Sequence, residues 1–266
     1  IDPLEMAEKY GADALRFNLI TGNSPGNDTR FYTEKCEAMR NFANKIWNAS
    51  RFVMMNLTID KCELPAADKL APEDKWVLSK LNSLINEVDD DLGNYLRTET
   101  ARALSDFVDN LSNWYVRRSR ERFWVSDMTE DKINAYMTLY TVLVTFCKLA
   151  APMIPFMTEE IYQNLVMSVD KNAPESIHLC DFPTVHEEWI DKDLEQNMEE
   201  VLHMVVMGRA ARNAANIKNR QPIGTMFVKA EKELPAFFKE IVEEELNVKE
   251  VVFREDMSSL TSYSFK

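Results

Sequence analysis

The stretch that most constrains this chain is residues 98–124, because one segment carries two different surfaces. Apolar side chains recur along it at alternating spacings of three and four residues, at Ala101, Leu104, Val108, Leu111 and Tyr115. That periodicity predicts an amphipathic helix whose apolar stripe must be covered by other helices. The last turns are basic instead, since residues 117–122 hold four arginines against one glutamate. We therefore expect a helix that is buried along one face and cationic at its C-terminal end.

This basic run admits two interpretations. Cations in the last turns of a helix are favoured by its dipole, so the run could be an ordinary solvated helix end. The alternative is a nucleic-acid contact, in which the arginines meet phosphates and the indole of Trp114 stacks on an unpaired base. In that interpretation the amide of Asn113 would meet the edge of a base. The residues alone leave both interpretations open.

The composition favours a helical globular protein. The chain has 266 residues, of which 45% are hydrophobic and 28% charged, enough for a sizeable core. Only 6 glycines occur, which argues against a turn-rich β architecture. The formal net charge is −13, so RNA binding would have to use local basic patches on an otherwise acidic protein.

Further amphipathic stretches predict a helical bundle, because long helices joined by short connections bury their apolar faces against one another. The predicted helices cover residues 3–19, 33–57, 73–92, 98–124, 130–150 and 158–169. Their expected inward residues include Leu4, Ala38, Phe42, Ile46, Ala49, Val53, Val77, Leu81, Leu84, Val88, Ile133, Met137, Tyr140, Val144 and Cys147. Loops are expected at 21–31, 58–72 and 170–190, the last of which could hold a short strand at 176–179.

Beyond residue 190 the sequence changes character. A long helix from residue 193 begins acidic and ends basic, with four cations and no acid between residues 209 and 220. Alternating side chains predict strands at 224–230 and 248–254, on either side of an acidic helix at 234–246. We therefore divide the chain into a connecting segment (1–32), a helical bundle (33–190), a long helix with a basic junction (191–223) and a small α+β module (224–266).

No catalytic or metal-binding constellation stands out. The histidines, His178, His186 and His203, lie on different predicted elements with no nucleophile at a recognisable spacing. The cysteines, Cys36, Cys62, Cys147 and Cys180, are far apart and lack zinc-ligand spacing. No P-loop, GxGxxG or HExxH motif occurs, nor a signal peptide or a run of 18 apolar residues. We expect no metal or other cofactor, no membrane contact, and reduced thiols in a cytoplasmic protein.

Several motifs resemble the anticodon-binding region of class I aminoacyl-tRNA synthetases. GADALR at 11–16 is similar to the DALR signature that precedes that region, although this motif alone is weak. The more specific motifs resemble isoleucyl-tRNA synthetases: LSNWYVRRSRERFW at 111–124, APMIPFMTEEIYQNL at 151–165, ESIHLCDFP at 175–183, GRAARNAANIKNRQPI at 208–223 and EEELNVKEVVF at 243–253. Residues 22–57 look more like valyl-tRNA synthetases, which leaves that family as an alternative.

The resemblance implies a mainly α, anticodon-binding helical bundle with a small C-terminal α+β module. Its expected role is recognition of a tRNA anticodon stem-loop as the C-terminal part of an isoleucine–tRNA ligase, acting in translation. The implied partners are isoleucine tRNA and the ligase's own catalytic domain, and we expect a monomer. The HIGH and KMSKS motifs, which hold ATP in that family, do not occur here. We therefore expect no amino-acid activation by this chain alone, because ATP and Mg²⁺ belong to the catalytic domain of the parent enzyme.

The candidate tRNA contacts combine two basic clusters with polar residues of the 33–57 helix. They are Asn41, Lys45, Asn48, Asn113, Trp114, Arg117, Arg118, Arg120, Arg209, Arg212, Lys218 and Arg220. The resemblance implies base-edge and backbone contacts for the asparagines and Lys45, stacking for Trp114, and phosphate contacts for the arginines and Lys218. Trp114 could equally be a core residue, and the chain could be a helical protein–protein scaffold that binds no RNA. Convergence of the 117–122 and 209–220 clusters on one face would favour RNA binding.

Overall fold

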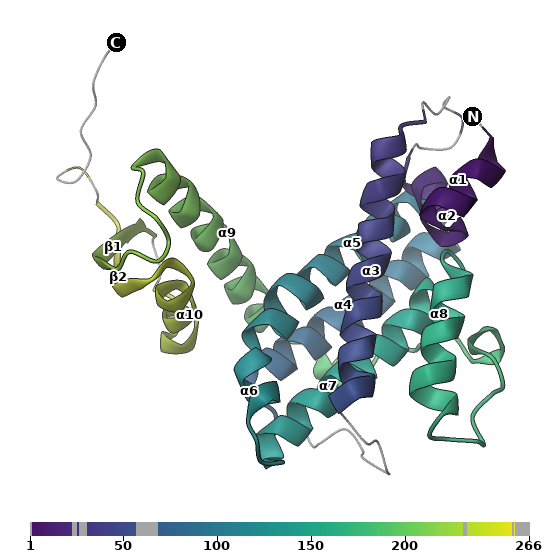
Figure 1. The fold of residues 1–266 in the computed structure, drawn as a ribbon. Coiled ribbons are helices and arrows are strands. Elements are labelled where there is room, and N and C mark those ends of the chain that lie inside the picture. The colour runs from purple at the N-terminus through teal and green to yellow at the C-terminus, as the bar shows by residue number, and fades with distance from the viewer. Residues whose placement is uncertain are drawn as a thin grey trace. The chain divides into compact units, whose positions relative to one another are not determined.

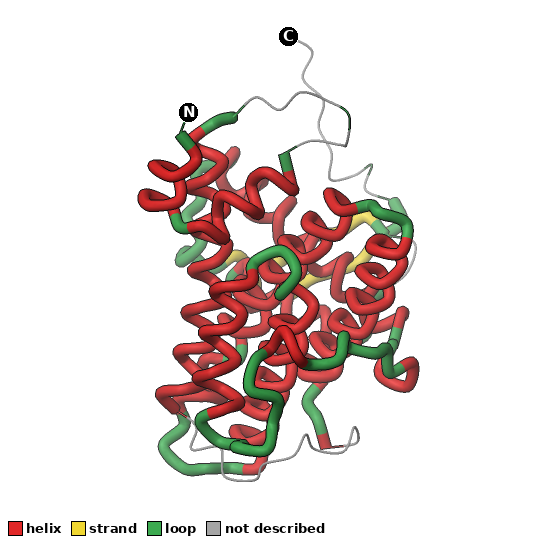
Figure 2. Tube along the Cα trace, turned by 90° about the vertical axis from the view of Figure 1, so that its right-hand side faces the viewer, coloured by secondary structure: helices red, strands yellow, loops and turns green. Residues whose placement is uncertain are grey.

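The structure is a computed structural model that describes residues 2–22, 26, 31–56, 69–230, 233–256 and 258. It forms two compact units, Ile1–Ile190 and Asp191–Lys266. Figure 1 labels the elements, and Figure 2 shows that helices dominate, so the mainly α fold class is confirmed. The predicted loop at 21–31 and the linker at 58–72 lie largely outside the described residues, as does Cys62.

The first unit is a bundle of helices. Its α-helices are α1 (Pro3–Tyr10), α2 (Ala12–Thr21), α3 (Thr33–Asn56), α4 (Pro72–Gly93), α5 (Arg97–Asn110), α6 (Arg120–Trp124), α7 (Glu130–Ala150) and α8 (Pro155–Tyr162). Two π-helices continue α5 and α8, at Leu111–Val116 and Gln163–Met167, and 3₁₀ turns follow at Ile177–Leu179 and Glu187–Trp189. The predicted 3–19 helix is divided in two because Gly11 adopts a φ of 94°, which interrupts the helical backbone.

Helix α7 is the central element of this bundle. It packs against α3, α4, α6 and α8, and Tyr136, Leu139, Leu143 and Phe146 on it are fully buried. By length and composition α7 would be able to cross a membrane, but 67% of its apolar stretch is buried inside the unit. Its apolar surface is therefore covered by the neighbouring helices, as in the core of a helical bundle.

Most of the predicted inward faces are confirmed. The stripe of residues 98–124 is buried along its whole length, and so are Phe42, Ile46, Ala49 and Val53 on α3 and Val77, Leu81, Leu84 and Val88 on α4. Leu4 is 72% exposed, however, and the inward position at the start of α3 is Cys36 rather than Ala38. The reason is that α2 meets α3 at Cys36, whose Sγ accepts a hydrogen bond from Asn18 at 3.2 Å.

The inward face predicted for α7 is correct only in part. Met137 and Cys147 are buried, but Ile133, Tyr140 and Val144 are half-buried. A helix that is covered on several sides buries residues all around its circumference, so a single stripe describes it poorly.

The strand considered at 176–179 is a 3₁₀ turn instead. Glu159 on α8 accepts a hydrogen bond from the backbone N–H of Ile177 at 2.9 Å and from the Ser176 hydroxyl at 2.8 Å. The local backbone is therefore bonded to a carboxylate, and this segment adds no strand to the described sheet.

The second unit is a small α+β module preceded by a long helix. Its elements are α9 (Lys192–Ala214), β1 (Ile223–Lys229), α10 (Ala236–Leu246) and β2 (Val248–Arg254). The strands are parallel, with Ile223 opposite Val248, and α10 supplies the crossover that a parallel pair requires. Gly208 of α9 lies directly against the side chain of Leu246, so α10 also packs closely on α9. Both predicted strands and the helix between them are confirmed.

Candidate nucleic-acid interface

Two segments of the first unit that are far apart in the sequence lie together. Lys45 on α3 forms an ion pair with Asp109 on α5, and further along both helices the ring of Phe52 lies 5.1 Å from that of Phe123. Sequence numbers increase in the same direction in both pairs, so α3 runs alongside the α5–α6 segment in parallel. The π-helix Leu111–Val116 contacts α3 as well.

This arrangement brings most of the candidate contacts of the first unit together. Asn48 lies about one turn beyond Lys45, and Asn113 lies about one turn beyond Asp109, so the polar face of α3 lies beside the π-helix. We call this the basic surface. Its candidate residues are Asn41, Lys45, Asn48, Asn113, Trp114, Arg117, Arg118 and Arg120. Asn41, Asn48, Asn113 and Arg120 are exposed, and the other four are half-buried.

Trp114 is neither a core residue nor an open platform. Its indole is half-buried, and the guanidinium of Arg117 lies 5.5 Å from its ring centroid in a cation–π contact. The Nε of Arg117 also donates a hydrogen bond to the backbone carbonyl of Asn113 at 2.7 Å. Arg117 is therefore oriented by its own helix, with its charge beside the ring.

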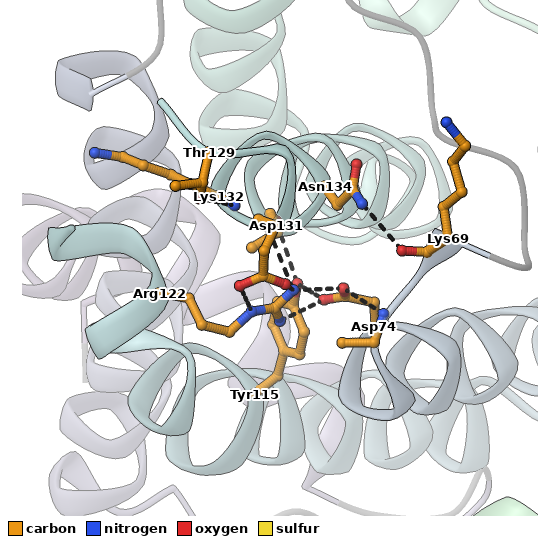
Figure 3. Close-up of polar contacts among 10 residues, drawn as sticks. Lys69, Asp74, Tyr115, Arg122, Thr129, Asp131, Lys132 and Asn134 are labelled. Carbon is orange, nitrogen blue, oxygen red and sulfur yellow. Dashed lines mark hydrogen bonds and ion pairs between the residues drawn. The ribbon is translucent and has the colours of Figure 1, made fainter. Parts of the chain in front are cut away.

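Arg122 does not belong to the basic surface, although it stands in the same run of the sequence. Figure 3 shows that it points inward, between Asp74 at the start of α4 and Asp131 at the start of α7. Its Nη1 and Nη2 donate to the two carboxylate oxygens of Asp74 at 2.9 and 2.7 Å. Its Nε and Nη2 donate to Asp131 at 2.9 and 2.7 Å. The basic run of residues 117–122 thus displays one cation fewer than the sequence suggests.

The carboxylate of Asp74 is wholly buried and fully used. Besides Arg122 it accepts a hydrogen bond from the hydroxyl of Tyr115 at 2.7 Å and from the backbone N–H of Ala71 at 3.3 Å. Burial and the negative charge of Asp74 raise the pKa of Tyr115 well above its ordinary value. Burial would lower the pKa of Arg122, but its hydrogen bonds to Asp74 and Asp131 raise it overall. This network fixes α6 to α4 and α7, which determines how the end of the basic surface is presented.

The second basic cluster, in the second unit, is partly used within that unit. Arg209 forms an ion pair with the buried carboxylate of Glu245 at 2.7 Å. Arg212 is 4% exposed and donates to the carbonyls of Lys218 at 2.7 Å, Asn219 at 3.2 Å and Gln221. Its prediction as a phosphate contact is therefore wrong for this structure, because its guanidinium is enclosed by the turn that it holds.

That turn displays the other two cations of the cluster. Lys218 and Arg220 are exposed on either side of Asn219, whose carbonyl accepts from both Arg212 and the side chain of Asn247. The clusters 117–122 and 209–220 belong to different units, so each is a surface of its own unit.

Among the described residues, no three His, Cys, Asp or Glu side chains are grouped so that they could hold a metal ion. Cys36 and Cys147 are buried in separate places, and Cys180 is partly exposed. Burial raises the pKa of the Cys147 thiol to about 12, so that thiol stays protonated at neutral pH.

The comparisons with known proteins agree on one family. The sequence model of a family described as "Anticodon-binding domain of tRNA ligase" matches residues 74–228. The isoleucine–tRNA ligase of Clostridium tetani (strain Massachusetts / E88) is 47% identical over 270 residues, which cover 100% of this chain and 26% of that protein. The isoleucine–tRNA ligase of Dehalococcoides mccartyi (strain CBDB1) is 44% identical over 275 residues, which cover 100% of this chain and 27% of that protein.

The chain thus spans about a quarter of the length of the curated relatives it matches. Both alignments include residues 22–57, so the isoleucyl interpretation is supported over the valyl alternative. Among solved structures, the chain resembles the agnB2 LeuRS of Agrobacterium radiobacter K84, crystallised as a LeuRS-tRNA-LeuAMS ternary complex. The TM-score is 0.53 at 17% identity, over 72% of this chain and 22% of that chain, which shows a shared fold.

Proposed function

This chain belongs to the family of anticodon-binding domains of tRNA ligases, and we propose that it recognises the anticodon stem-loop of isoleucine tRNA. It would do so in the cytoplasm, as the C-terminal part of a monomeric isoleucine–tRNA ligase whose catalytic domain supplies ATP and Mg²⁺ chemistry. The observation that carries this proposal is the basic surface, where the Lys45–Asp109 ion pair brings the asparagines of α3 beside Asn113, Trp114 and Arg117.

The chemistry of this surface suits single-stranded RNA. Unpaired bases in a loop can be splayed out, stacked on aromatic or guanidinium planes and hydrogen-bonded at their edges. The pair of Trp114 and Arg117 offers an aromatic ring and a guanidinium plane side by side, and Asn48 and Asn113 offer exposed amides. The chain has a formal charge of −13, so its acidic remainder repels RNA. Binding is therefore limited to the local cationic surface.

The roles differ along the surface. Arg118 and Arg120 would contact phosphates, which position the RNA without reading its sequence. On the second unit, the exposed Lys218 and Arg220 would separately contact phosphates. Asn41, Asn48 and Asn113 would contact base edges, which supply sequence preference. No cofactor takes part in this binding, and we expect the purified chain to carry no stoichiometric zinc in elemental analysis.

The test is a comparison of isoleucine and valine tRNA for binding to the 266-residue chain at several matched salt concentrations, because affinity without the salt concentration cannot be interpreted. We expect tighter binding of isoleucine tRNA. Replacing Trp114 with Ala should weaken binding of that tRNA by about 1–3 kcal/mol through loss of stacking. Replacing Arg118 with Ala should weaken both tRNAs alike and reduce the salt dependence by about one phosphate contact.

The matched control removes one positive charge elsewhere on the first unit. Lys171 is exposed and donates only to the carbonyl of Met167 among the described residues, so Lys171→Ala should leave the affinity for both tRNAs unchanged. Equal binding of both tRNAs, unaffected by any change in the basic surface, would favour a helical protein–protein scaffold instead.

A further inference from the structure

Trp124 is the most exposed of the chain's tryptophans. It is 69% exposed, whereas Trp76 is buried and Trp47, Trp114 and Trp189 are half-buried. Tryptophan is enriched among the residues that dominate binding energy at interfaces, so an exposed indole is a candidate contact. The position of Trp124, at the last residue of α6, therefore calls for a physical explanation.

The two residues before Trp124 are fixed, which holds the indole outward. Phe123 is buried against the rings of Tyr136, at 4.8 Å, and Phe52, at 5.1 Å. Arg122 is bound to both Asp74 and Asp131. With Arg122 and Phe123 anchored, the end of α6 is held so that the indole lies on its solvent-facing side. The backbone that carries the indole therefore needs no rearrangement when a partner binds.

Trp124 continues the basic surface along the same segment. Asn113, Arg117, Arg120 and Trp124 follow one another at spacings of four, three and four residues, and each is exposed or half-buried. The alternate set of Leu111, Tyr115, Ser119 and Phe123 is buried. The first set therefore shares the solvent-facing side. Arg120 is exposed and forms no ion pair within the part of the chain that the structure describes.

The surroundings of Trp124 favour a neutral planar group over a phosphate. Val125 and Met128 follow Trp124 closely in the sequence and are 43% and 56% exposed, so apolar side chains are exposed in this segment. Glu121 and Asp127 are exposed carboxylates close by in the sequence, which would repel a phosphate placed on the ring. A base can stack on the indole while its own phosphate reaches toward Arg120, one turn earlier on α6.

We propose that Trp124 is a second stacking platform, which takes an unpaired nucleobase of the bound RNA beyond the bases that meet Trp114 and the asparagines. This inference rests on the proposed function and extends its binding site to the end of α6. The ligand class is a single-stranded nucleotide with its base on the indole and its phosphate at Arg120.

The experiment uses the 266-residue chain and a hairpin that carries the isoleucine anticodon stem and loop. Trp124→Ala should weaken binding roughly 5- to 140-fold, the range that corresponds to loss of one stacked base. Trp124→Phe should retain most of the affinity, because a benzene ring still offers a stacking face. Phe156→Ala is the matched control, since Phe156 is 66% exposed on α8 of the same unit and should leave the affinity unchanged.

Abasic substitutions separate stacking from any effect on folding. One loop position at a time is replaced by an abasic nucleotide, and each hairpin is measured against wild type, Trp124→Ala and Trp124→Phe. At the nucleotide that stacks on Trp124, the abasic change should weaken wild type but add nothing to Trp124→Ala, a coupling that a partly unfolded variant would not show.

The outcomes are distinguishable. If Trp124→Ala binds as tightly as wild type while Arg117→Ala binds more weakly, Trp124 lies outside the RNA-binding site, and a contact with another protein becomes the better explanation of its exposure. If no loop position is coupled to Trp124, the stacking inference is wrong even where affinity falls. If wild type binds neither the hairpin nor isoleucine tRNA, the proposed function fails together with this inference.

Discussion

Asp74 and Arg122, 48 residues apart in the sequence, are joined by two parallel hydrogen bonds of 2.9 and 2.7 Å between guanidinium and carboxylate. The side chain of Asp74 is 0% exposed and that of Arg122 is 16% exposed, so water screens this pair poorly. A buried pair is weak evidence of net stabilisation, but removing Asp74 leaves Arg122 with only the exposed carboxylate of Asp131 as a charged partner among the described residues. Its effect on folding is therefore best measured by removing one member.

Asp74→Asn should lower the free energy of unfolding by roughly 3–5 kcal/mol, because Arg122 loses its buried partner and Tyr115 loses a charged acceptor. The measurement is urea denaturation followed by circular dichroism. The control is Asp131→Asn, since the Asp131 side chain is 55% exposed and should cost only about 0–1 kcal/mol. Equal effects of the two variants would show that burial does not set the strength of these contacts.

Tyr115 should make stability depend on pH in the alkaline range. Burial and the charge of Asp74 raise its pKa well above the ordinary value of 10.0. As the pH rises through 10.0, the unfolded chain releases the phenolic proton while the folded chain keeps it, so the free energy of unfolding falls. The Tyr115→Phe variant has no phenolic proton and so lacks this pH-dependent contribution to the free energy of unfolding.

At neutral pH the phenylalanine variant should therefore be less stable than wild type by about 1.5–3 kcal/mol, the value of a hydrogen bond to a charged group. Above pH 10.0 the difference should narrow. Denaturation curves recorded from neutral to alkaline pH measure it directly. A difference that stays constant across this range would contradict the raised pKa.

Gly208 should show opposite responses to alanine in two backgrounds. A Cβ at this position would lie well inside van der Waals contact with Leu246, which is 1% exposed and has little room to move. Gly208→Ala should therefore destabilise the second unit, despite the gain of about 1 kcal/mol in helix propensity. In a Leu246→Ala background the clash is absent, and the same change should stabilise by about 1 kcal/mol. Thermal denaturation of the four proteins of this cycle checks the sign reversal.

Arg212 and Arg220 should separate stability from RNA binding. Arg212 is enclosed and bonded to the carbonyls of the turn at 218–221, so Arg212→Met should lower the melting temperature. Arg220 is exposed, so Arg220→Met should leave the melting temperature unchanged and weaken tRNA binding at low salt. A loss of stability in Arg220→Met would show that this side chain is also used within the second unit.

The periodicity of apolar residues was sufficient to predict those elements that bury only one face. The stripe from Ala101 to Tyr115 is spaced like a helix with one covered face, and it is buried as expected. The two strands of the second unit and the helix between them likewise follow from the sequence pattern, whereas their parallel pairing comes from the structure. Periodicity describes α7 less well because its neighbours cover it on several sides.

The site was harder to predict because the order of charged residues in a sequence does not show whether each side chain points to solvent or into the protein. Arg120 and Arg122 stand two residues apart, yet one is exposed and the other is paired with an aspartate from another helix. In the sequence, Arg212 similarly looks available for a phosphate contact, but in the structure its guanidinium is bonded to the turn that follows α9. Asp74 stands at the third position of α4, where an acidic side chain commonly caps the helix, so the sequence does not single it out as the partner of Arg122.

The π-helix Leu111–Val116 makes the backbone geometry of this segment as important as its composition. A turn closed by an i→i+5 hydrogen bond contains one residue more than an α turn. This turn lies between α5 and α6, which carries Arg122 and Trp124. If the same residues adopted α geometry with none removed, the downstream side chains would rotate by roughly 100° about the helix axis. Arg122 would leave Asp74, and Trp124 would face a different direction. The wide π turn therefore sets the direction in which both side chains point.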